Sequence, residues 1–122
     1  MICGEIYAAS NTTYNASTNA ERIYFIKSIG HEVLSNEPET KAVVIPEAFS
    51  DVYNNYNDIQ RLSGYDLADY KGCEVVVYTY SIKTPAGYDG DCVLNMIVYN
   101  GRVIGGDVSS AALAGFMLPI KN

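Results

Sequence analysis

Apolar side chains recur at intervals of three and four residues in the first half of the chain. Three isoleucines carry this spacing within residues 18–29: Ile23, Ile26 and Ile29. Thr18 and Glu21 have the spacing of a capping box, and Gly30 follows at the position where a left-handed residue commonly ends a helix. The pattern predicts an amphipathic helix over residues 18–29.

A second segment with the same period lies between Pro46 and Gly64. Its apolar stripe has six members: Phe49, Val52, Tyr53, Tyr56, Ile59 and Leu62. The other face is polar and is expected to meet solvent: Ser50, Asp51, Asn54, Asn55, Asn57, Asp58 and Arg61. Proline is favoured in the first turn of a helix and glycine just after its end, so these two residues predict the limits of the helix.

Elsewhere the apolar residues alternate with polar ones or run consecutively, as they do in strands. Five segments have this pattern: residues 31–39, 40–46, 73–83, 92–100 and 102–110. A polar turn interrupts the first segment, and Pro46 ends the second. Asn100 and Gly101 form the dipeptide that most strongly predicts a tight hairpin turn, so the last two strands are expected to pair.

The predicted architecture is a single α+β domain. Two helices are expected to pack on one face of a curved antiparallel sheet of about four to five strands. This domain takes in residues 18–122, and its tail is expected to close the core through Leu113, Phe116 and Met117. Residues 1–17 are rich in Asn, Ser, Thr and Ala without any period, and we interpret them as an N-terminal arm or the remnant of a tether.

The charge balance excludes one class of partner. The chain has 14 acidic and 8 scattered basic residues, for a formal net charge of −6. Binding to nucleic acid or to an anionic membrane surface requires clustered Lys and Arg. We therefore expect no nucleic-acid partner, and membrane contact only through an N-terminal anchor outside these residues.

The compartment stays open at this point. The first residues, MICG, have neither the basic region nor the apolar region of a signal peptide. The protein is then either cytoplasmic or an extracytoplasmic domain whose anchor precedes this sequence. Asn11 and Asn15 begin glycosylation sequons, which matter only in a eukaryotic secretory host.

Few residues suggest cofactor or metal chemistry. Cys3, Cys73 and Cys92 are too few for a disulfide framework, and the last two are expected at opposite ends of a hairpin, too far apart to bond. His31 is the only histidine, so a structural zinc site and a base-activated nucleophile are both disfavoured. We expect no cofactor, no metal and no catalytic residues. An unrecognised hydrolase ranks third among the functions considered.

The acidic and glycine-rich motifs are expected to be structural. Residues 88–91, YDGD, lack the further ligands of a calcium loop, and Asp66 and Asp69 are interpreted as a capping or turn pair. The glycine-rich segment 101–117 fits neither a phosphate loop nor a dinucleotide loop. Gly105-Gly106 predicts a bulge or a close approach of a helix to the backbone, with Asp107 binding nearby amides.

Tyrosine is the unusual component, with eleven residues against three phenylalanines and no tryptophan. Small sheets use tyrosine to form strands, and protein interfaces are also enriched in it. Both faces of the predicted hairpin are apolar, so one is expected to carry tyrosines outward. The candidate binding residues are Tyr78, Tyr80 and Tyr99. The arm, with Ile6, Tyr7 and Tyr14, is one candidate cover for that face.

Several motifs together resemble a known family. They are ERIYFIKSIGHEV, VVIPEAFSDVYNNYNDIQRLSGYDLADYKG, VVVYTY and VIGGDVSSAALAGFM, and they extend from Glu21 to about Leu118. The chain is similar to an uncharacterised Gram-positive bacterial family, the domain of unknown function 4830. The resemblance implies a short N-terminal membrane anchor and one extracytoplasmic domain. It supplies no activity and no catalytic residues, and His31 stands where a bulkier aromatic is expected.

These observations favour a non-enzymatic extracytoplasmic binding or sensing domain of a bacterial surface protein. Its expected partner is a protein, a peptide or a cell-wall component. The alternative is a structural or regulatory module that forms a homodimer through the tyrosine-rich sheet face.

Overall fold

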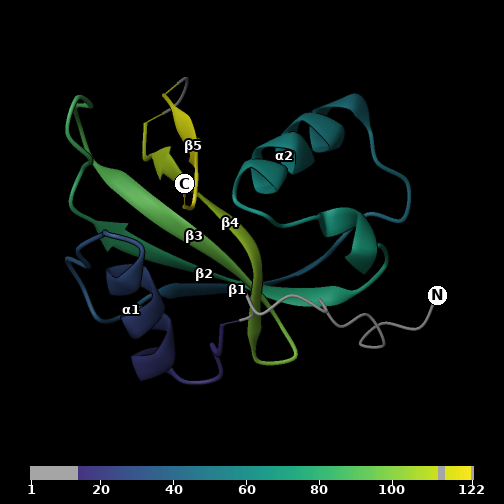
Figure 1. Ribbon diagram of the computed structural model, residues 1–122, viewed down its shortest axis with the longest axis horizontal. Helices are drawn as coiled ribbons and strands as arrows, with labels where there is room; N and C mark the ends of the chain where they lie inside the picture. The colour runs from purple at the N-terminus through teal and green to yellow at the C-terminus, as the bar shows by residue number, and fades with distance from the viewer. Residues whose placement is uncertain (1–13, 113–114, 122) are drawn as a thin grey trace.

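A computed structural model describes residues 14–112 and 115–121 as two helices, a short 3-10 helix and a five-stranded sheet (Figure 1). The strands follow the chain in the order β1-β2-β3-β4-β5, and every neighbouring pair is antiparallel. The predicted α+β class is confirmed. In chain order the elements are α1 Asn19–Ser28, β1 Glu39–Val44, α2 Asp51–Leu62, η1 Leu67–Tyr70, β2 Glu74–Ile82, β3 Cys92–Tyr99, β4 Arg102–Ser110 and β5 Met117–Pro119.

The first predicted helix agrees with the structure, and the second begins later than predicted. The Thr18 hydroxyl accepts from the Glu21 amide, and the Glu21 carboxylate accepts from the Thr18 amide, which completes the capping box of α1. In α2 the N-cap is Ser50, whose hydroxyl accepts from the Tyr53 amide. Pro46 therefore lies before the helix and not in its first turn.

The predicted strand over residues 31–39 was wrong. Only Val33 forms an isolated bridge, to Ile82, and two backbone bonds flank it. The Leu34 amide donates to the Ser81 carbonyl, and the Lys83 amide donates to the Glu32 carbonyl. The segment thus crosses the end of β2, and the regular edge strand begins only at Glu39.

The two helices cover opposite faces of the sheet, whereas one shared face was predicted. The even-numbered β2 residues Tyr80 and Ile82 pack with Phe25 of α1. The odd-numbered Val75 and Val77 pack with Tyr53 and other residues of α2. Since successive strand residues point to opposite faces, an apolar residue at nearly every position of β2 and β3 requires a cover on both sides.

β4 contains a bulge and contributes residues to both cores. Ile97 pairs with Gly105 and Val98 pairs with Val103, so Ile104 is an extra residue in β4. The extra residue reverses the alternation, so Val103 before the bulge and Val108 after it both pack in the α1 core, although ordinary alternation would place them on opposite faces. The predicted bulge at this position is confirmed.

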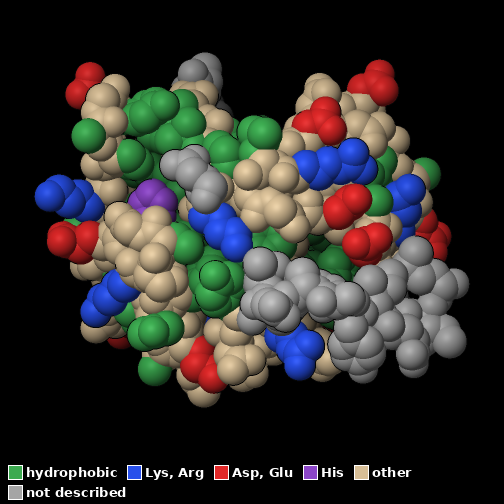
Figure 2. Space-filling model, viewed as in Figure 1, with side chains coloured by type: hydrophobic (Ala, Val, Ile, Leu, Met, Phe, Trp, Pro, Cys, Tyr) green, Lys and Arg blue, Asp and Glu red, His purple; other side chains and the backbone are tan. Residues whose placement is uncertain are grey.

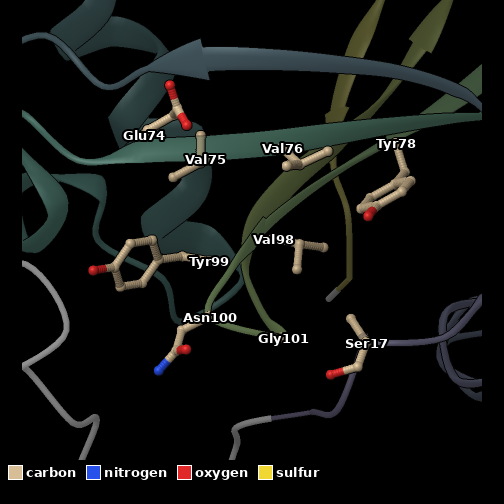
Figure 3. A pocket seen from close by; sticks show the side chains of 10 residues that line it. Ser17, Glu74, Val75, Val76, Tyr78, Val98, Tyr99, Asn100 and Gly101 are labelled. Carbon is tan, nitrogen blue, oxygen red and sulfur yellow. The ribbon is translucent and has the colours of Figure 1, made fainter.

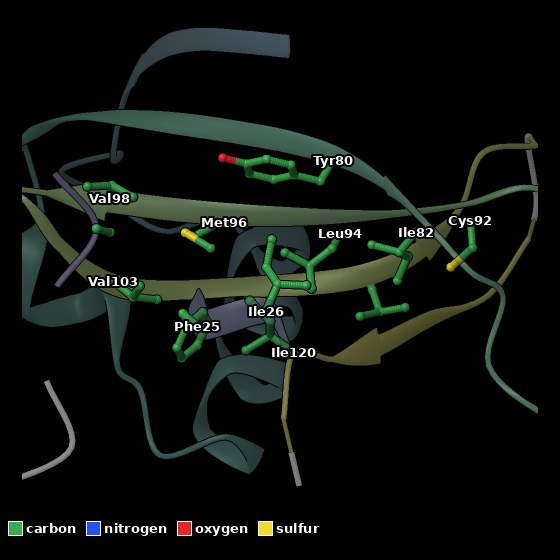
Figure 4. Close-up of a cluster of buried hydrophobic side chains, with 12 residues drawn as sticks. Phe25, Ile26, Tyr80, Ile82, Cys92, Leu94, Met96, Val98, Val103 and Ile120 are labelled. Atoms are coloured by element: carbon green, nitrogen blue, oxygen red, sulfur yellow. The ribbon is translucent and has the colours of Figure 1, made fainter. Parts of the chain in front are cut away.

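The larger core lies between α1 and β2–β4 (Figure 4). Its fully buried members include Phe25, Ile26, Leu94 and Met96. The tail closes this core mainly through Ile120, which is fully buried, since Met117 is 45% exposed. Phe116 packs against the cluster as predicted, and Leu113 lies outside the described residues.

Candidate functional site

Tyr80, one of the three predicted binding residues, is not on the surface. Its side chain is fully buried, and its hydroxyl donates to Asn19 Oδ1 at 2.6 Å while accepting from Arg22 Nε at 3.1 Å. Because α1 packs directly on this part of β2, Tyr80 is a core residue that anchors the helix to the sheet. Tyr80 therefore cannot contact a binding partner at the surface.

Tyr78 and Tyr99 are half-buried, and their rings lie on different sides of the sheet. Tyr78 packs against the α1 core, whereas the Tyr99 ring packs 5.6 Å from Tyr70 on the α2 side. The single tyrosine-rich outer face expected from the sequence is therefore absent from the described residues. A hollow nevertheless brings parts of both residues together.

That hollow is a groove of about 460 Å³ over the adjacent ends of β2 and β3, and we refer to it as the β2–β3 groove (Figure 3). Val76 and Val98, which pair across the two strands, form its apolar floor. Tyr78 stands at one end of the β2 side and Glu74 at the other. The rim is completed by Ala16, Ser17, Asn100 and Gly101.

A buried arginine holds one wall of this groove in place. Arg22 of α1 is only 8% exposed, and its guanidinium carbon lies 3.8 Å from the centroid of the Tyr78 ring. Its Nη1 donates to the Ala16 carbonyl at 2.8 Å. The Ala16 amide in turn donates to the Gly101 carbonyl at 2.7 Å. The groove is therefore formed before any ligand arrives, which lowers the entropic cost of binding.

The turn at the other wall has a backbone that few residues adopt. Asn100 has φ 53° and Gly101 has φ 75°, as a type I′ hairpin turn requires. A Cβ at Gly101 would collide with the Ser17 hydroxyl, so the turn and the segment before α1 fit closely. Asn-Gly at this position serves both the hairpin and the shape of the groove.

The electrostatics of the groove are acidic. Glu74 is exposed, and none of the described residues that line the groove is Lys or Arg. The nearby Arg22 stacks on Tyr78 and binds a carbonyl, so its charge is already engaged. An apolar floor beside a carboxylate that forms no ion pair with another described residue suits a ligand with both an apolar portion and a cationic group.

A second polar cluster lies buried between α2 and the sheet, and the sequence did not reveal it. Asp107 is 2% exposed and accepts three side-chain hydrogen bonds. The Tyr56 hydroxyl donates to Oδ2 at 2.7 Å, and Asn95 Nδ2 and the Ser109 hydroxyl donate to Oδ1 at 3.0 and 2.5 Å. Burial, followed by the charge of Asp107, raises the pKa of Tyr56, so its hydroxyl stays protonated and donates.

This cluster corrects the expected role of Asp107. Its partners are side chains of α2, β3 and β4, not the amides of the bulge. The Gly106 amide donates instead to Gln60 Oε1 at 2.7 Å. A Cβ at Gly105 would lie 2.8 Å from the same oxygen, so the predicted close approach of a helix is confirmed. The cluster fastens α2 to the sheet.

The polar and apolar faces of α2 also differ from the prediction. Val52 and Leu62 were assigned to the apolar stripe, yet they are 79% and 68% exposed. Asn57 was assigned to the solvent face, yet it is buried, with Oδ1 accepting from the Leu67 amide and Nδ2 donating to Asp66. Asn57 of α2 therefore faces η1, where its side chain is the partner that the buried Leu67 amide needs.

Asp66 caps η1, as the capping interpretation predicted. It accepts from the Ala68 amide at 2.9 Å and from Arg61 at 3.3 Å. Burial by itself would raise the pKa of this carboxyl, but hydrogen bonds from Asn57 and Ala68 and the charge of Arg61 together hold it below its usual range. Its role is structural.

The remaining candidates lie outside the groove. His31 follows α1. Burial lowers its pKa, and a hydrogen bond with the Ile120 backbone raises it by a smaller amount, so the pKa stays below its usual value. Cys92 is a buried free thiol, so it is not bonded to Cys73, as the hairpin geometry predicted. Cys3 lies outside the described residues. In the same described ranges, no group of three or more His, Cys, Asp and Glu side chains is placed to hold a metal.

The visible face in Figure 2 carries an apolar area near β5 and acidic side chains over α2. Just before β5 the ring of Phe116 lies 4.4 Å from that of Tyr88, and Met117 at the start of β5 is exposed. Across residues 14–112 and 115–121, no helix has the length and hydropathy needed to cross a membrane.

The chain was compared with models of known protein families. The model of the domain of unknown function DUF4830 matches residues 25–108. The chain belongs to this family. The DUF4830 match runs from the middle of α1 into β4 and includes the floor of the groove, the Asn100-Gly101 turn and Asp107. No curated protein and no solved structure matches the chain.

Proposed function

We propose that this DUF4830 domain is a non-enzymatic binding domain of a bacterial surface protein, and that it holds a short peptide in the β2–β3 groove. The observation that carries the proposal is the groove itself, which combines a preformed wall, an apolar valine floor and the exposed carboxylate of Glu74. The partner is a protein segment or a cell-wall peptide outside the cytoplasmic membrane.

The dimensions of the groove support an extended peptide. Glu74 and Tyr78 lie on the same face of β2, four residues apart, which corresponds to about 13 Å along a strand. A peptide of about four extended residues has that length. Its alternate side chains would meet the valine floor, and the remaining ones would point to solvent.

The charges indicate which peptide. Among the described residues that line the groove, Glu74 is the acidic one and none is Lys or Arg, and the net charge of the chain is −6. The domain therefore favours a peptide with a side-chain amine at the Glu74 end and an apolar side chain two residues away. Acidic peptides are disfavoured by repulsion.

The proposal is tested by titrating peptides into ¹⁵N-labelled protein. The probe is Ac-Lys-Ala-Val-Ala-NH₂, and the comparison peptides carry norleucine or glutamate in place of lysine. Binding in the groove is expected to shift the amide resonances of Val76, Val98 and Gly101, most strongly with the lysine peptide and least with the glutamate peptide.

Two variants separate the charge from the rest of the surface. Glu74→Gln is expected to weaken the lysine peptide about two- to fivefold, as for one exposed ion pair, and to leave the norleucine peptide unchanged. Glu37→Gln removes the same charge beyond the far end of β1 and is expected to change nothing. Equal shifts for all three peptides, or shifts only outside the groove, would refute the proposal.

A further inference from the structure

Within the described part of the chain, one edge of the sheet has no strand paired with it. β1 is the end strand, paired on one side with β2, and five of its six residues are exposed. The opposite edge is β5, which has only three residues and includes Pro119. An exposed edge strand is a template for pairing with another strand, and proteins usually protect it with a bulge, a proline or a cover. β1 contains no bulge and no proline; it does carry two exposed charged residues, Glu39 and Lys41, and charged side chains are a further means of protecting an edge.

The backbone groups that face outward can be assigned from the pairing with β2. The Ile45 amide donates to the Cys73 carbonyl, and the register pairs Val43 with Val75 and Lys41 with Val77. Antiparallel pairs alternate between bonded and non-bonded. The odd-numbered residues of β1 therefore bond to β2, and the outward N–H and C=O groups belong to Thr40, Ala42 and Val44.

Two prolines limit this free edge. Pro38 and Pro46 occupy the even-numbered positions on either side of Thr40, Ala42 and Val44, and proline has no N–H to offer. The edge therefore offers three successive outward N–H donors, those of Thr40, Ala42 and Val44, and no more.

We infer that two copies of this chain associate through β1, antiparallel, with Ala42 on the two-fold axis. In this register Ala42 lies opposite Ala42 of the second copy, and Thr40 lies opposite Val44. All three outward residues then exchange both hydrogen bonds, which gives six bonds across the axis. The two five-stranded sheets become one continuous sheet.

Neighbouring registers are worse for identifiable reasons. Centring the pair on Lys41 places two ammonium groups directly opposite each other. Centring it on Thr40 sets Ala42 against Pro38, and centring it on Val43 sets Thr40 against Pro46, so a donor is missing in each case. Registers shifted by one residue place inward-bonding residues opposite outward ones and form no ladder.

The dimer is weak and depends on salt. Six backbone bonds along three residues bury less than the roughly 1,200 Å² typical of stable complexes, so association is transient. Each copy carries a net charge of −6, and the two repel each other. Screening removes that repulsion, so dimerisation strengthens as salt rises from low to physiological concentration.

Sedimentation equilibrium with a charge swap at the axis tests the inference. Ala42 is exposed, so a longer side chain is accommodated in the monomer. Ala42→Lys and Ala42→Glu each place like charges opposite one another and are expected to make the protein monomeric, whereas an equal mixture of the two variants is expected to form a heterodimer. Ala48→Lys adds the same charge at another exposed alanine beyond β1 and is expected to dimerise as the unmodified protein does.

Each sedimentation outcome either supports or overturns the β1 dimer. A concentration-dependent dimer that either axis variant abolishes and the mixture restores supports the register. An unmodified protein that remains monomeric up to about 1 mM at physiological salt overturns self-association. A dimer that survives in both single variants overturns the β1 interface. Peptide titration of the groove is measured on monomer and dimer alike, so failure of one proposal does not affect the other.

Discussion

The buried carboxylate of Asp107 allows a quantitative prediction for Tyr56→Phe. The substitution keeps the ring, which packs 5.9 Å from that of Tyr53, and removes the hydroxyl that donates to Oδ2 at 2.7 Å. Asn95 and Ser109 both bind Oδ1, so Oδ2 loses its side-chain donor. A hydrogen bond to a buried charged group contributes about 1.5–3 kcal/mol. We expect a loss of about 2 kcal/mol in unfolding free energy at pH 7, or about 8 °C in Tm for a domain of this size.

Urea unfolding followed by far-UV circular dichroism measures this loss. Tyr53→Phe is the matched control, because Tyr53 is on the same helix and its hydroxyl makes no hydrogen bond within the described part of the chain. It is expected to cost less than about 0.5 kcal/mol. In an Asp107→Asn background, Tyr56→Phe is expected to cost about half as much, since a neutral acceptor gains less. A cost for Tyr56→Phe equal to that of Tyr53→Phe would refute the role assigned to the cluster.

Two further predictions concern pH and backbone conformation. Burial lowers the pKa of His31, so the unfolded chain binds its proton more readily, and stability is expected to fall as pH drops below about 6.5. His31→Gln should flatten unfolding free energy between pH 7.5 and 5.5, and an unchanged slope would contradict this account. Gly106 has φ 153°, and a Cβ there would overlap the carbonyl oxygen of Asn95. Gly106→Ala is expected to cost about 3 kcal/mol or more, against about 1 kcal/mol for Gly64→Ala, whose Cβ would meet open space; equal costs measured by urea unfolding would exclude the overlap.

The elements that the sequence predicted well are those specified by neighbouring residues. Thr18 and Glu21 close a capping box within one turn, and Asn100-Gly101 requires only its own backbone angles. The three long strands were located to within one residue because Gly, Pro and Asn mark their ends. Such signals act before tertiary packing exists, and so they can be recognised in isolation.

The errors arose where a distant partner decides the outcome. Tyr80 is buried because Asn19 and Arg22 of α1 supply partners for its hydroxyl, and nothing near Tyr80 in sequence indicates them. Asn57 is buried because η1 needs its amide side chain. The separation of the helices onto two faces depends on both hairpin faces being apolar, a pattern that the sequence displays and that we interpreted as one exposed face.

The groove was predicted only in part. Tyr78 and Tyr99 were named from composition, and both line it. Glu74, Val76 and Val98 were missed, because the site depends on where α1 stops covering the sheet. That limit is set by Arg22 and Ala16, which come together only in the folded chain.

The order of the strands also has a kinetic consequence. Short connections join the last four strands, β2 to β5, so each neighbouring pair can form its hydrogen bonds as soon as the connection between them closes. β1 is separated from β2 by the long segment that contains α2 and η1, and closing that loop costs more entropy. β1 is therefore the last strand to dock and the first to leave. While it is detached, β2 has an open edge that β1 of another chain fits as well as its own, so refolding at high concentration favours strand-exchanged dimers.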